Sequence, residues 1–529
     1  MRAPGMRRLP VGPGRFLGRI VALLVLLATA AFFLPGQVPA GAQQAETWIE
    51  AKPMGVGRSG HTSTLLAGPL CVPVARRAWC GKVLVVGGYV ASFTALDSTE
   101  LYDPVSGTWA ATKKSDGGVT RLAQARAQHN AVQLLDGSVL VIGGTDGTSP
   151  LRSVELYNPD DGTWTGVGDL NFDHRSTGAL RGPAVALLQG TAATCGTNCG
   201  RVLVVGAFGG GKEVENKAAE LYDPTTKSWI PTAPSTFKQD GGSGSHVLSQ
   251  DPCGTRCGNV LFRGRGVVGV GGAELYDPRA GAWVVTATPS VALVNYSVLL
   301  ADGRVLFPRG SSGPPAQAYD PTDGEWHTVA DNGVGRGRGP LIRLPDGRVL
   351  SAGGTTGDSV SASLYSPDPA PTGTWTDTIP LASARTTPSI ILLPCAARNG
   401  RVLGVGGTQG PSGNPALATA ELYDRVPTLQ AVTRIAGPAV GGRVPVRLRG
   451  LGFHSSQDVQ DVQVSFGETL ASDVVVKGDG TQIDVKAPIT ARPVPVTVTV
   501  GGIRADTCGP PPLFTTAACP TTAEVGLGA

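Results

Sequence analysis

The sequence is built around a repeated unit, and its clearest copy is Gly81–Trp109. The apolar run Val83–Val86 predicts a strand buried on both faces, and it ends at a Gly-Gly pair that suits a turn or a close backbone approach. Ser98–Tyr102 predicts a half-buried strand, and Asp103–Gly107 supplies the Asp, Pro and Gly of a tight turn before the last strand. With a first strand within 60–66, each unit predicts a four-stranded, up-and-down antiparallel sheet.

Seven copies of the central signature follow one another along the chain. They are ELYDP (100–104), ELYNP (155–159), ELYDP (220–224), ELYDP (274–278), QAYDP (317–321), SLYSP (363–367) and ELYDR (421–425). Six of them are followed by a tryptophan in the last strand, at Trp109, Trp164, Trp229, Trp283, Trp326 and Trp375. A recurring unit of this kind is typical of a repeat architecture.

The seventh copy has no tryptophan after it, but the chain has one ahead of the first copy. Glu46–Glu50 has the pattern of an outer strand that contains Trp48. If this strand pairs with the seventh copy, it closes a ring of seven sheets without exposed edges. The sequence therefore predicts an all-β, seven-bladed β-propeller over residues 43–425. The 75 Gly and 42 Pro, with 41% hydrophobic residues, also fit a β fold with many turns rather than disorder.

The Gly-Gly pair, the Leu-Tyr-Asp-Pro signature and the spaced Gly-Thr-Trp resemble the kelch repeat of the galactose oxidase-like propeller superfamily. The resemblance covers about residues 45–425. Three copies depart from the Gly-Gly pattern, at Gly206-Ala207, Arg263-Gly264 and Arg309-Gly310. We expect these blades to be more irregular.

The pattern changes after Arg425, where alternating apolar sequence with Gly and Pro turns predicts further strands. Gly441-Gly442, the RGLGF run (449–453) and Phe466-Gly467 resemble an IPT/TIG module, which is an immunoglobulin-like β-sandwich of the E-set type. This second domain is expected over residues 426–515, and residues 516–529 form a tail with no sorting signal that we recognise.

Residues 1–42 are typical of a secretory signal peptide. An Arg-bearing start, the fifteen-residue apolar run Ile20–Leu34 and the small residues Ala40-Gly41-Ala42 predict cleavage before Gln43 and a secreted protein. An uncleaved membrane anchor is the alternative, although this run is shorter than the roughly 20 residues that span a bilayer. No membrane span is expected after cleavage. Cleavage removes five arginines and changes the net charge from +4 to −1, which argues against nucleic-acid binding.

The cysteines agree with export to an oxidising compartment. Local disulfides are expected for the pairs Cys71/Cys80, Cys195/Cys199, Cys253/Cys257 and Cys508/Cys519. Each closes a short loop, so we expect about 2 to 3 kcal/mol of stability from each, within its own loop rather than between blades. A four-cysteine zinc site from the CGTNC and CGTRC loops is the alternative. Cys395 lies in the same kind of loop without a partner, as a free thiol or the remnant of a lost pair.

Four arginines occupy equivalent places, nine residues before the end of the predicted first strand. They are Arg58, Arg126, Arg336 and Arg385, and His61 and His129 follow two of them by three residues. In kelch-like propellers the start of this strand lies near one mouth of the central channel. We therefore expect these six side chains to bind an anionic ligand, because guanidinium groups form charge-assisted hydrogen bonds with carboxylates. A structural, loop-bonding role is the alternative.

A kelch propeller followed by an immunoglobulin-like domain also resembles the galactose and glyoxal oxidases, whose copper is held by two Tyr and two His. None of the six His here adjoins a Tyr, and His454 in the terminal domain lacks the partner residues of that site. We therefore expect a secreted, non-catalytic binding protein without cofactor or metal, whose partner is an extracellular glycan or protein. A copper-radical carbohydrate or alcohol oxidase and a structural extracellular module are the alternatives. The composition, rich in Arg, Ala, Gly and Pro, fits a bacterium with a GC-rich genome.

Overall fold

The computed structural model describes most of the chain after residue 46. The described ranges, apart from short gaps within them, are 47–172, 183–206, 217–239, 245–265, 271–331, 339–424, 428–504 and 524–525. Residues 1–42, Arg336, Cys395, Cys508 and Cys519 therefore lie outside the described residues, and so does most of the predicted tail.

Antiparallel sheets follow one another along the chain, with strand order equal to chain order in the first three. The first sheet contains β2 (Thr62–Leu65), β3 (Val83–Val86), β4 (Thr99–Asp103) and β5 (Thr108–Ala111). The second contains β6 (Asn130–Gln133), β7 (Val139–Ile142), β8 (Ser153–Asn158) and β9 (Thr163–Asp169). The third contains β10 (Ala184–Leu187), β11 (Val202–Val205), β12 (Ala219–Asp223) and β13 (Ser228–Thr232). The strands predicted in the first repeat therefore lie where the sequence pattern placed them.

The next three sheets continue the series. The fourth contains β14 (Lys238–Gln239), β15 (His246–Val247), β16 (Val260–Arg265), β17 (Gly271–Asp277) and β18 (Ala282–Val285), with β14 and β15 both paired to β16. The fifth contains β19 (Val298–Leu299), β20 (Val305–Phe307), β21 (Gln317–Asp320) and β22 (Glu325–Thr328). The sixth contains β23 (Leu341–Arg343), β24 (Val349–Ala352), β25 (Ala362–Ser366) and β26 (Thr374–Asp377). In the fourth sheet, Arg263 and Gly264 continue the strand where other copies turn at Gly-Gly.

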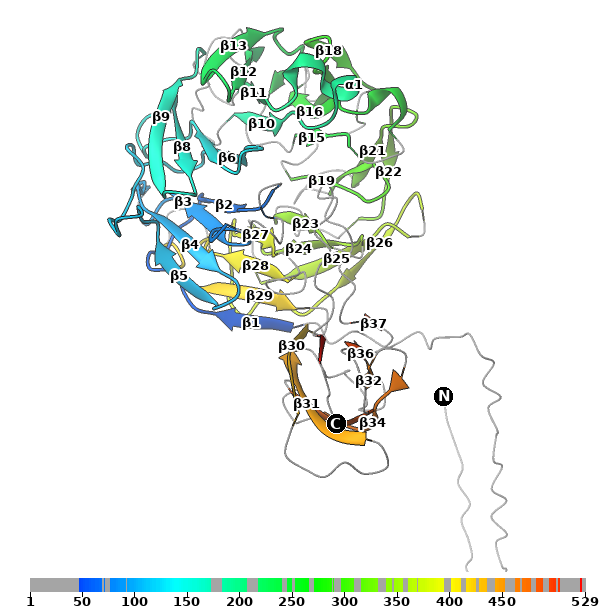
Figure 1. Cartoon of the computed structure of the whole chain (residues 1–529). Helices are drawn as coiled ribbons and strands as arrows, with labels where there is room; N and C mark the ends of the chain where they lie inside the picture. Colours follow the sequence, from blue (N-terminus) through cyan, green and yellow to red (C-terminus); the bar gives the residue numbers. More distant parts are fainter. Residues whose placement is uncertain are drawn as a thin grey trace, which may run out of the picture. The chain divides into compact units, whose positions relative to one another are not determined.

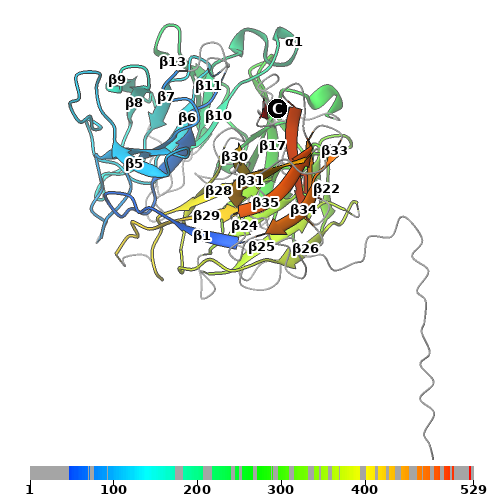
Figure 2. The same cartoon turned by 60° about the horizontal axis from the view of Figure 1, so that its bottom comes forward.

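The seventh sheet joins the two ends of the series. It contains β27 (Ser389–Leu392), β28 (Val402–Val405), β29 (Ala420–Asp424) and β1 (Thr47–Ala51), which is its outer strand. β1 runs antiparallel to β29, with Trp48 opposite Tyr423 (Figure 2).

The apolar cores lie between neighbouring sheets. Val83 and Val85 of β3 pack in one cluster with Leu403 of the seventh sheet, whereas Leu84 packs with Val139 of the second. Successive residues of a strand point to opposite faces, so a run such as VLVV serves two interfaces at once and is buried throughout. Each further pair of neighbouring sheets shares a cluster in the same way, and Figure 1 shows the sheets side by side around a common centre.

In the first, sixth and seventh sheets, the first glycine of the Gly-Gly pair admits the backbone of the next sheet. Gly87 has φ +58°, and a Cβ there would lie 2.3 Å from the carbonyl oxygen of Arg126. Gly406 has φ +61° and meets the carbonyl oxygen of Arg58 at 2.4 Å in the same way. Only glycine fits such a position, because a side chain would be both strained and in collision.

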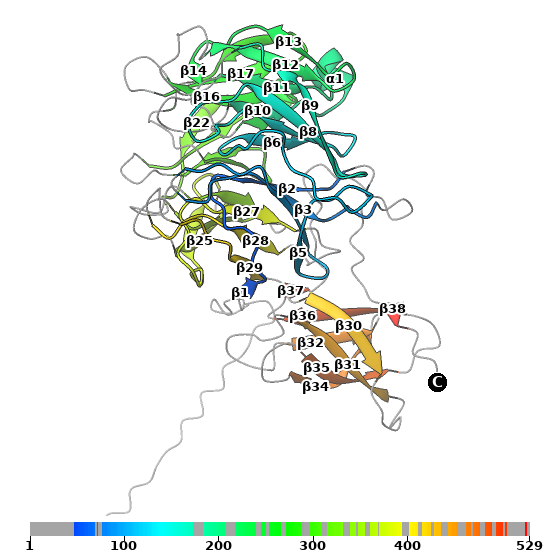
Figure 3. The same ribbon diagram turned by 90° about the vertical axis from the view of Figure 1, so that its left-hand side faces the viewer.

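Two more antiparallel sheets follow residue 427 and share one apolar core. One contains β30 (Thr428–Arg434), β31 (Arg443–Leu451), β35 (Gln482–Pro488) and β34 (Ser472–Val476). The other contains β33 (Thr469–Leu470), β32 (Val462–Phe466), β36 (Val494–Val500), β37 (Ile503–Arg504) and β38 (Glu524–Val525). Figure 3 shows the strands of these two sheets. Alternate residues of the strands, such as Val446, Val464 and Ile483, form the core between the sheets.

Helical structure is confined to loops in the part of the chain that the structure describes. The short helix α1 (Ala192–Cys195) and the 3-10 helices η3 (Gly196–Asn198) and η5 (Gly254–Arg256) lie between first and second strands of the third and fourth sheets. None of the described helices has the length and apolar character needed to cross a membrane.

Candidate functional site

Three of the four predicted arginines are buried and paired with a glutamate of their own sheet. All three side chains are 0% exposed. The pairs are Arg58 Nη2 to Glu100 Oε1 at 2.6 Å, Arg126 Nη2 to Glu155 Oε1 at 2.7 Å and Arg385 Nε to Glu421 Oε1 at 2.9 Å. Each glutamate is the first residue of an ELY signature, so its side chain comes from the third strand of the sheet.

Each arginine also binds backbone carbonyls of its own sheet. Arg126 Nη1 donates to the carbonyl oxygens of Gly143 at 3.0 Å and Ser153 at 2.9 Å, and its Nη2 donates to Ser153 Oγ at 3.0 Å. Glu155 accepts the backbone N–H groups of Ala123 at 2.7 Å and Gln124 at 3.3 Å. The ion pair therefore ties the incoming loop to the sheet on which it lands.

The structure places these three arginines inside their sheets. Their guanidinium groups bind carboxylates and carbonyls inside the sheets and do not face a mouth that is open to ligand. Burial lowers the pKa of Arg58, Arg126 and Arg385 below the ordinary value, and the paired glutamate offsets only part of this shift. An anionic ligand would have to displace an internal carboxylate, which favours the structural interpretation. Arg336 lies outside the described residues.

The predicted histidines are buried between neighbouring sheets. His129 Nε2 lies 2.8 Å from Thr62 Oγ1 and so bridges the second and first sheets. Burial and the nearby Arg58 lower the pKa of His61 to about 3. Burial, Arg126 and His61 hold the pKa of His129 well below its ordinary 6.5. Both rings are therefore neutral near pH 7, and they offer no positive charge to an anion.

The glutamates that complete these contacts were not predicted from the sequence. Glu220 and Glu274 do the same for the incoming loops of the third and fourth sheets, where they accept the N–H groups of Asn171 at 3.0 Å and Thr236 at 2.8 Å. A sequence signal was present, because an arginine at the equivalent place accompanies an ELY glutamate in the first, second and seventh copies. The sixth copy has Arg336 but Ser363 in place of glutamate.

A groove of about 570 Å³ opens beside the first of these glutamates. Its walls come from the β1–β2 connection, from β4 and β5, and from the segment that follows β5. The lining residues are Lys52, Pro53, Gly55, Val56, Ser98, Thr99, Glu100, Thr108, Trp109, Ala110, Ala111, Val119, Thr120 and Arg121. β1 and β5 belong to different sheets, so the groove lies at the junction of the seventh and first sheets, and Figure 3 shows these two strands near each other.

The charged floor of the groove is already satisfied. Glu100 accepts hydrogen bonds from the N–H groups of Gly55 at 2.7 Å and Val56 at 3.3 Å. It also accepts one from the Nη2 atom of the buried Arg58. The oxygens of this carboxylate are therefore occupied by N–H and guanidinium groups of the protein itself.

The rim of the groove combines apolar and cationic groups on a fixed frame. Val119 is 56% exposed, and Lys52 and Arg121 are also exposed. Arg121 pairs with Asp97 at 2.8 Å. The indole Nε1 of Trp109 donates to the carbonyl oxygen of Lys52 at 2.7 Å, which fixes one wall to the other.

Hydroxyl groups hold the segment that carries Val119 against the sheet. Thr112 Oγ1 donates to the carbonyl oxygen of Thr120 at 3.1 Å and accepts from Thr120 Oγ1 at 3.0 Å. Thr99 Oγ1 of β4 contacts the same Thr112 hydroxyl. The rim is consequently ordered before any partner binds.

In the part of the chain that the structure describes, one set of His, Cys, Asp and Glu side chains lies close enough to share a metal ion, and its members are Asp320, Asp323 and His327. This set spans the outer turn from the end of β21 to β22, contains a single histidine, and has His327 Nε2 2.9 Å from Asp323 Oδ2. His454 lies outside the described residues.

Three of the four predicted disulfides are present in the described residues. Cys71–Cys80, Cys195–Cys199 and Cys253–Cys257 have Cα separations of 5.5, 5.0 and 5.0 Å. The last two pairs use the four cysteines of the alternative zinc site, so in this structure these cysteines bond within their own loops instead of sharing a metal.

The kelch motif matches residues 126–171 of this chain. Kelch-like protein 23 of Pongo abelii is 26% identical over 46% of this chain and 39% of its own length. Kelch-like protein 28 of Mus musculus is 32% identical over 25% of this chain and 22% of its length. Kelch-like protein 35 of Mus musculus is 25% identical over 39% of this chain and 32% of its own length. The chain thus spans between about a fifth and two-fifths of the length of these relatives.

A solved structure described as a novel fungal alcohol oxidase with catalytic diversity among the AA5 family, in complex with copper, is also similar. It is 14% identical and has a TM-score of 0.47, with 87% of this chain and 98% of that chain covered.

Proposed function

We propose that this chain, whose kelch motif and kelch-like relatives support a kelch-repeat β-propeller, is an exported, non-catalytic protein that binds another protein. The observation that carries the proposal is the groove at the junction of the seventh and first sheets, where an ordered apolar and cationic rim surrounds a carboxylate that is already fully bonded.

We further propose a seven-bladed ring over residues 43–425, closed by β1. The support is that seven sheets have core clusters shared between neighbours, and that one of these clusters joins the seventh sheet to the first. A ring of this kind holds the groove rigidly, because each sheet packs on two others. We assign residues 426–515 to an IPT/TIG-like domain on the basis of its sequence and its two sheets with a common core, and 516–529 to a tail.

The chemistry of the rim favours a protein partner over a glycan. Protein interfaces combine exposed apolar side chains with arginine, as Val119 and Arg121 do here. Trp109, the aromatic residue that lines the groove, packs against Tyr102 with ring centroids 4.8 Å apart, and its indole N–H is already bonded to Lys52. Its ring is therefore less available as a platform for stacking a sugar.

Export is proposed from residues 1–42 and from the disulfides. Three closed disulfides in the described residues suit an oxidising compartment. N-terminal sequencing of the exported protein tests this point: we expect it to begin at Gln43, whereas a chain that retains the apolar run Ile20–Leu34 would be anchored in a membrane.

An array of secreted and cell-surface proteins, printed beside glycans, tests the function. We expect the protein without its signal peptide to bind at least one protein and none of the glycans. Binding confined to glycans would overturn the choice of partner class, and no binding at all would overturn the proposal. Copper content after reconstitution, with an assay for peroxide release, tests the oxidase alternative, for which we expect neither bound copper nor peroxide.

A further inference from the structure

The disulfide-closed loops do more than close on themselves. Each lies between the first and second strands of its sheet, and each contacts the outer turn of the next sheet along the chain. The outer turns are residues 158–162, 277–281 and 320–324, which precede β9, β18 and β22. The loop and the turn that it contacts are about 65 to 90 residues apart in sequence.

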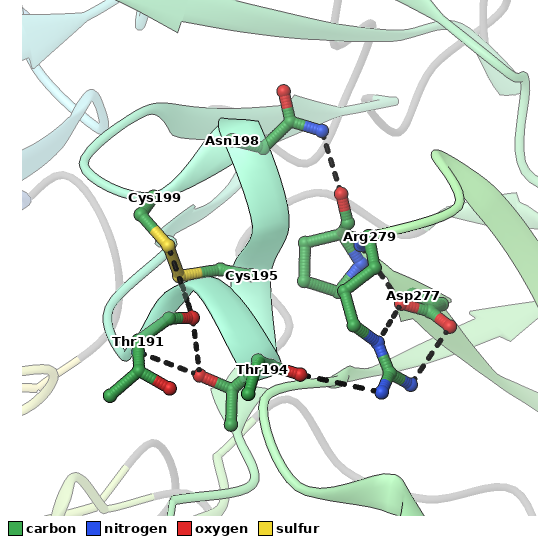
Figure 4. The surroundings of a disulfide bond; sticks show 9 residues. Thr191, Thr194, Cys195, Asn198, Cys199, Asp277 and Arg279 are labelled. Atoms are coloured by element: carbon green, nitrogen blue, oxygen red, sulfur yellow. Dashed lines mark hydrogen bonds and ion pairs between the residues drawn. A yellow bond between two sulfur atoms is a disulfide. The ribbon is translucent and has the colours of Figure 1, made fainter.

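The loop of the third sheet binds the turn of the fourth (Figure 4). Asn198 Nδ2, inside the Cys195–Cys199 ring, donates to the carbonyl oxygen of Pro278 at 2.6 Å. Arg279 of that turn lies toward the loop in return, with Nη1 3.5 Å from the carbonyl oxygen of Ala193. The donor atom thus belongs to a residue whose position the disulfide determines.

The loop of the fourth sheet binds the turn of the fifth by the same device. Arg256, inside the Cys253–Cys257 ring, donates through Nη1 to the carbonyl oxygens of Pro321 at 2.6 Å and Thr322 at 3.2 Å. Its Nη2 lies 3.4 Å from the carbonyl oxygen of Asp323. One guanidinium group therefore covers three successive carbonyls of the neighbouring turn.

The loop of the first sheet binds the turn of the second through side chains. Trp79, next to Cys80, donates through Nε1 to Asp160 Oδ1 at 2.7 Å, and Arg77 Nη1 pairs with Asp160 Oδ2 at 2.9 Å. The same indole packs over Gly137, where a Cβ would lie 2.7 Å from it. Three junctions between sheets therefore have a disulfide-held donor on a neighbouring turn.

A fourth junction has the contact without the disulfide. Arg304 of the fifth sheet donates through Nη1 to the carbonyl oxygen of Pro371 in the sixth at 2.6 Å. It follows the short turn at Asp302, whose carboxylate holds the guanidinium at 2.6 and 2.9 Å. In this short turn, the ion pair with Asp302 fixes the position of the donor Arg304. In the three longer loops, a disulfide fixes the position of the donor residue.

We propose that the three disulfides are redox-dependent clamps between neighbouring sheets. In the oxidised protein the closed loop presents its donor to the next sheet's turn. When an added dithiol supplies two electrons and two protons, the S–S bond breaks into two thiols, and the dithiol becomes a cyclic disulfide. The opened loop regains conformational freedom, its donor leaves the turn, and the junction loosens. The disulfides therefore stabilise the contact with the next sheet as well as the loop that each of them closes.

Hydrogen exchange of the full chain, oxidised and after treatment with dithiothreitol, tests the proposal. The reporters are the amides of Gly162, Gly281 and Gly324, which donate across the three clamped turns. We expect their exchange to accelerate about tenfold on reduction, because a local opening then breaks fewer contacts. Residues 371–377, whose clamp is Arg304, serve as the internal control and should not change. Thiol titration establishes that reduction has occurred. If the disulfides resist dithiothreitol, the double variants C195S/C199S and C253S/C257S take the place of the reduced protein.

Two single variants separate the clamp from the disulfide. Arg256→Ala should accelerate exchange at 320–324 in the oxidised protein about as much as reduction does, and reduction of this variant should add nothing there. Arg304→Ala, the matched control, should loosen 371–377 in both redox states. Acceleration confined to the disulfide loops, with the neighbouring turns unchanged, would overturn the proposal. Equal acceleration at 371–377 would also overturn it, because the protein would then loosen as a whole.

Discussion

Trp48 of β1 and Tyr423 of β29 lie opposite each other across the pair that joins the two ends of the sheet series. Their ring centroids are 5.1 Å apart, and the indole Nε1 of Trp48 donates to the carbonyl oxygen of Ile379 in the sixth sheet at 3.0 Å. One side chain near the start of the chain therefore contacts two sheets formed by residues more than 300 positions later.

The first prediction follows from that contact. Trp48→Ala should lower the free energy of unfolding by about 3 to 5 kcal/mol, because it removes a large buried aromatic ring. Urea unfolding measures the change. Glu50→Ala, an exposed position on the same strand, is the control and should change stability by less than about 0.5 kcal/mol. A Trp48→Ala protein as stable as the parent would mean that β1 does not close the ring.

The second prediction concerns the buried ion pairs. Arg126→Met should cost about 3 to 5 kcal/mol of unfolding free energy, since it leaves Glu155 buried without its cation. Arg121→Met removes an exposed pair with Asp97 and should cost no more than about 1 kcal/mol. Chemical denaturation of both variants provides the comparison. Equal, small losses would restore the interpretation of Arg126 as a ligand-binding residue.

The third prediction tests why the Gly-Gly pair is needed. Gly87→Ala should destabilise the protein by roughly 1 to 3 kcal/mol, because the position has a positive φ and its Cβ would collide with the Arg126 carbonyl. Gly166→Ala in β9 is the matched control, since nothing lies within 4 Å of a Cβ there. Differential scanning calorimetry measures the melting temperatures. Equal melting temperatures for Gly87→Ala and Gly166→Ala would contradict the close approach at Gly87.

The fourth prediction is a loss of stability in acid that depends on the buried histidines. Burial, the largest cause, and then Arg58 lower the pKa of His61 to about 3, and burial lowers the pKa of His246 to about 4. The unfolded chain binds these protons near the ordinary pKa of 6.5, so it takes up more protons than the folded state below that pH. The stability contributed above pH 6.5 is therefore lost progressively as the pH falls toward 3.

Melting temperatures between pH 8 and pH 4 measure this dependence. Below pH 6.5, His61→Gln should show a smaller fall than the parent, because glutamine takes up no proton on unfolding. Parallel curves for parent and His61→Gln would show that His61 does not titrate on unfolding as described.

The sequence predicted the strands well because each has a strong local signal. The run Val83–Val86 is apolar at every position because it faces a neighbouring sheet on both sides, and its Gly-Gly ending follows from one close backbone contact. The pattern of tryptophans also pointed to the strand that pairs with β29, because a missing residue at one end had a spare copy at the other.

The candidate site was harder to predict because its partners are distant in sequence. The equivalent arginines were recognised, but a sequence does not show which side of a strand faces a carboxylate 29 to 42 residues away. Buried and exposed arginines look alike in a repeat. The groove was also missed, since its walls come from a connection at 52–56 and a segment at 119–121 that have no repeat signal of their own.

The groove's role in binding is tested by the affinity of the best-binding protein from the array for the parent and two variants. Val119 and Val284 are both 56% exposed, and only Val119 lines the groove. We expect Val119→Asp to weaken binding about tenfold or more, because a buried interface carboxylate without a partner costs at least about 1.4 kcal/mol, whereas Val284→Asp should bind like the parent. Equal affinity for all three forms, measured by biolayer interferometry, would contradict this role of the groove.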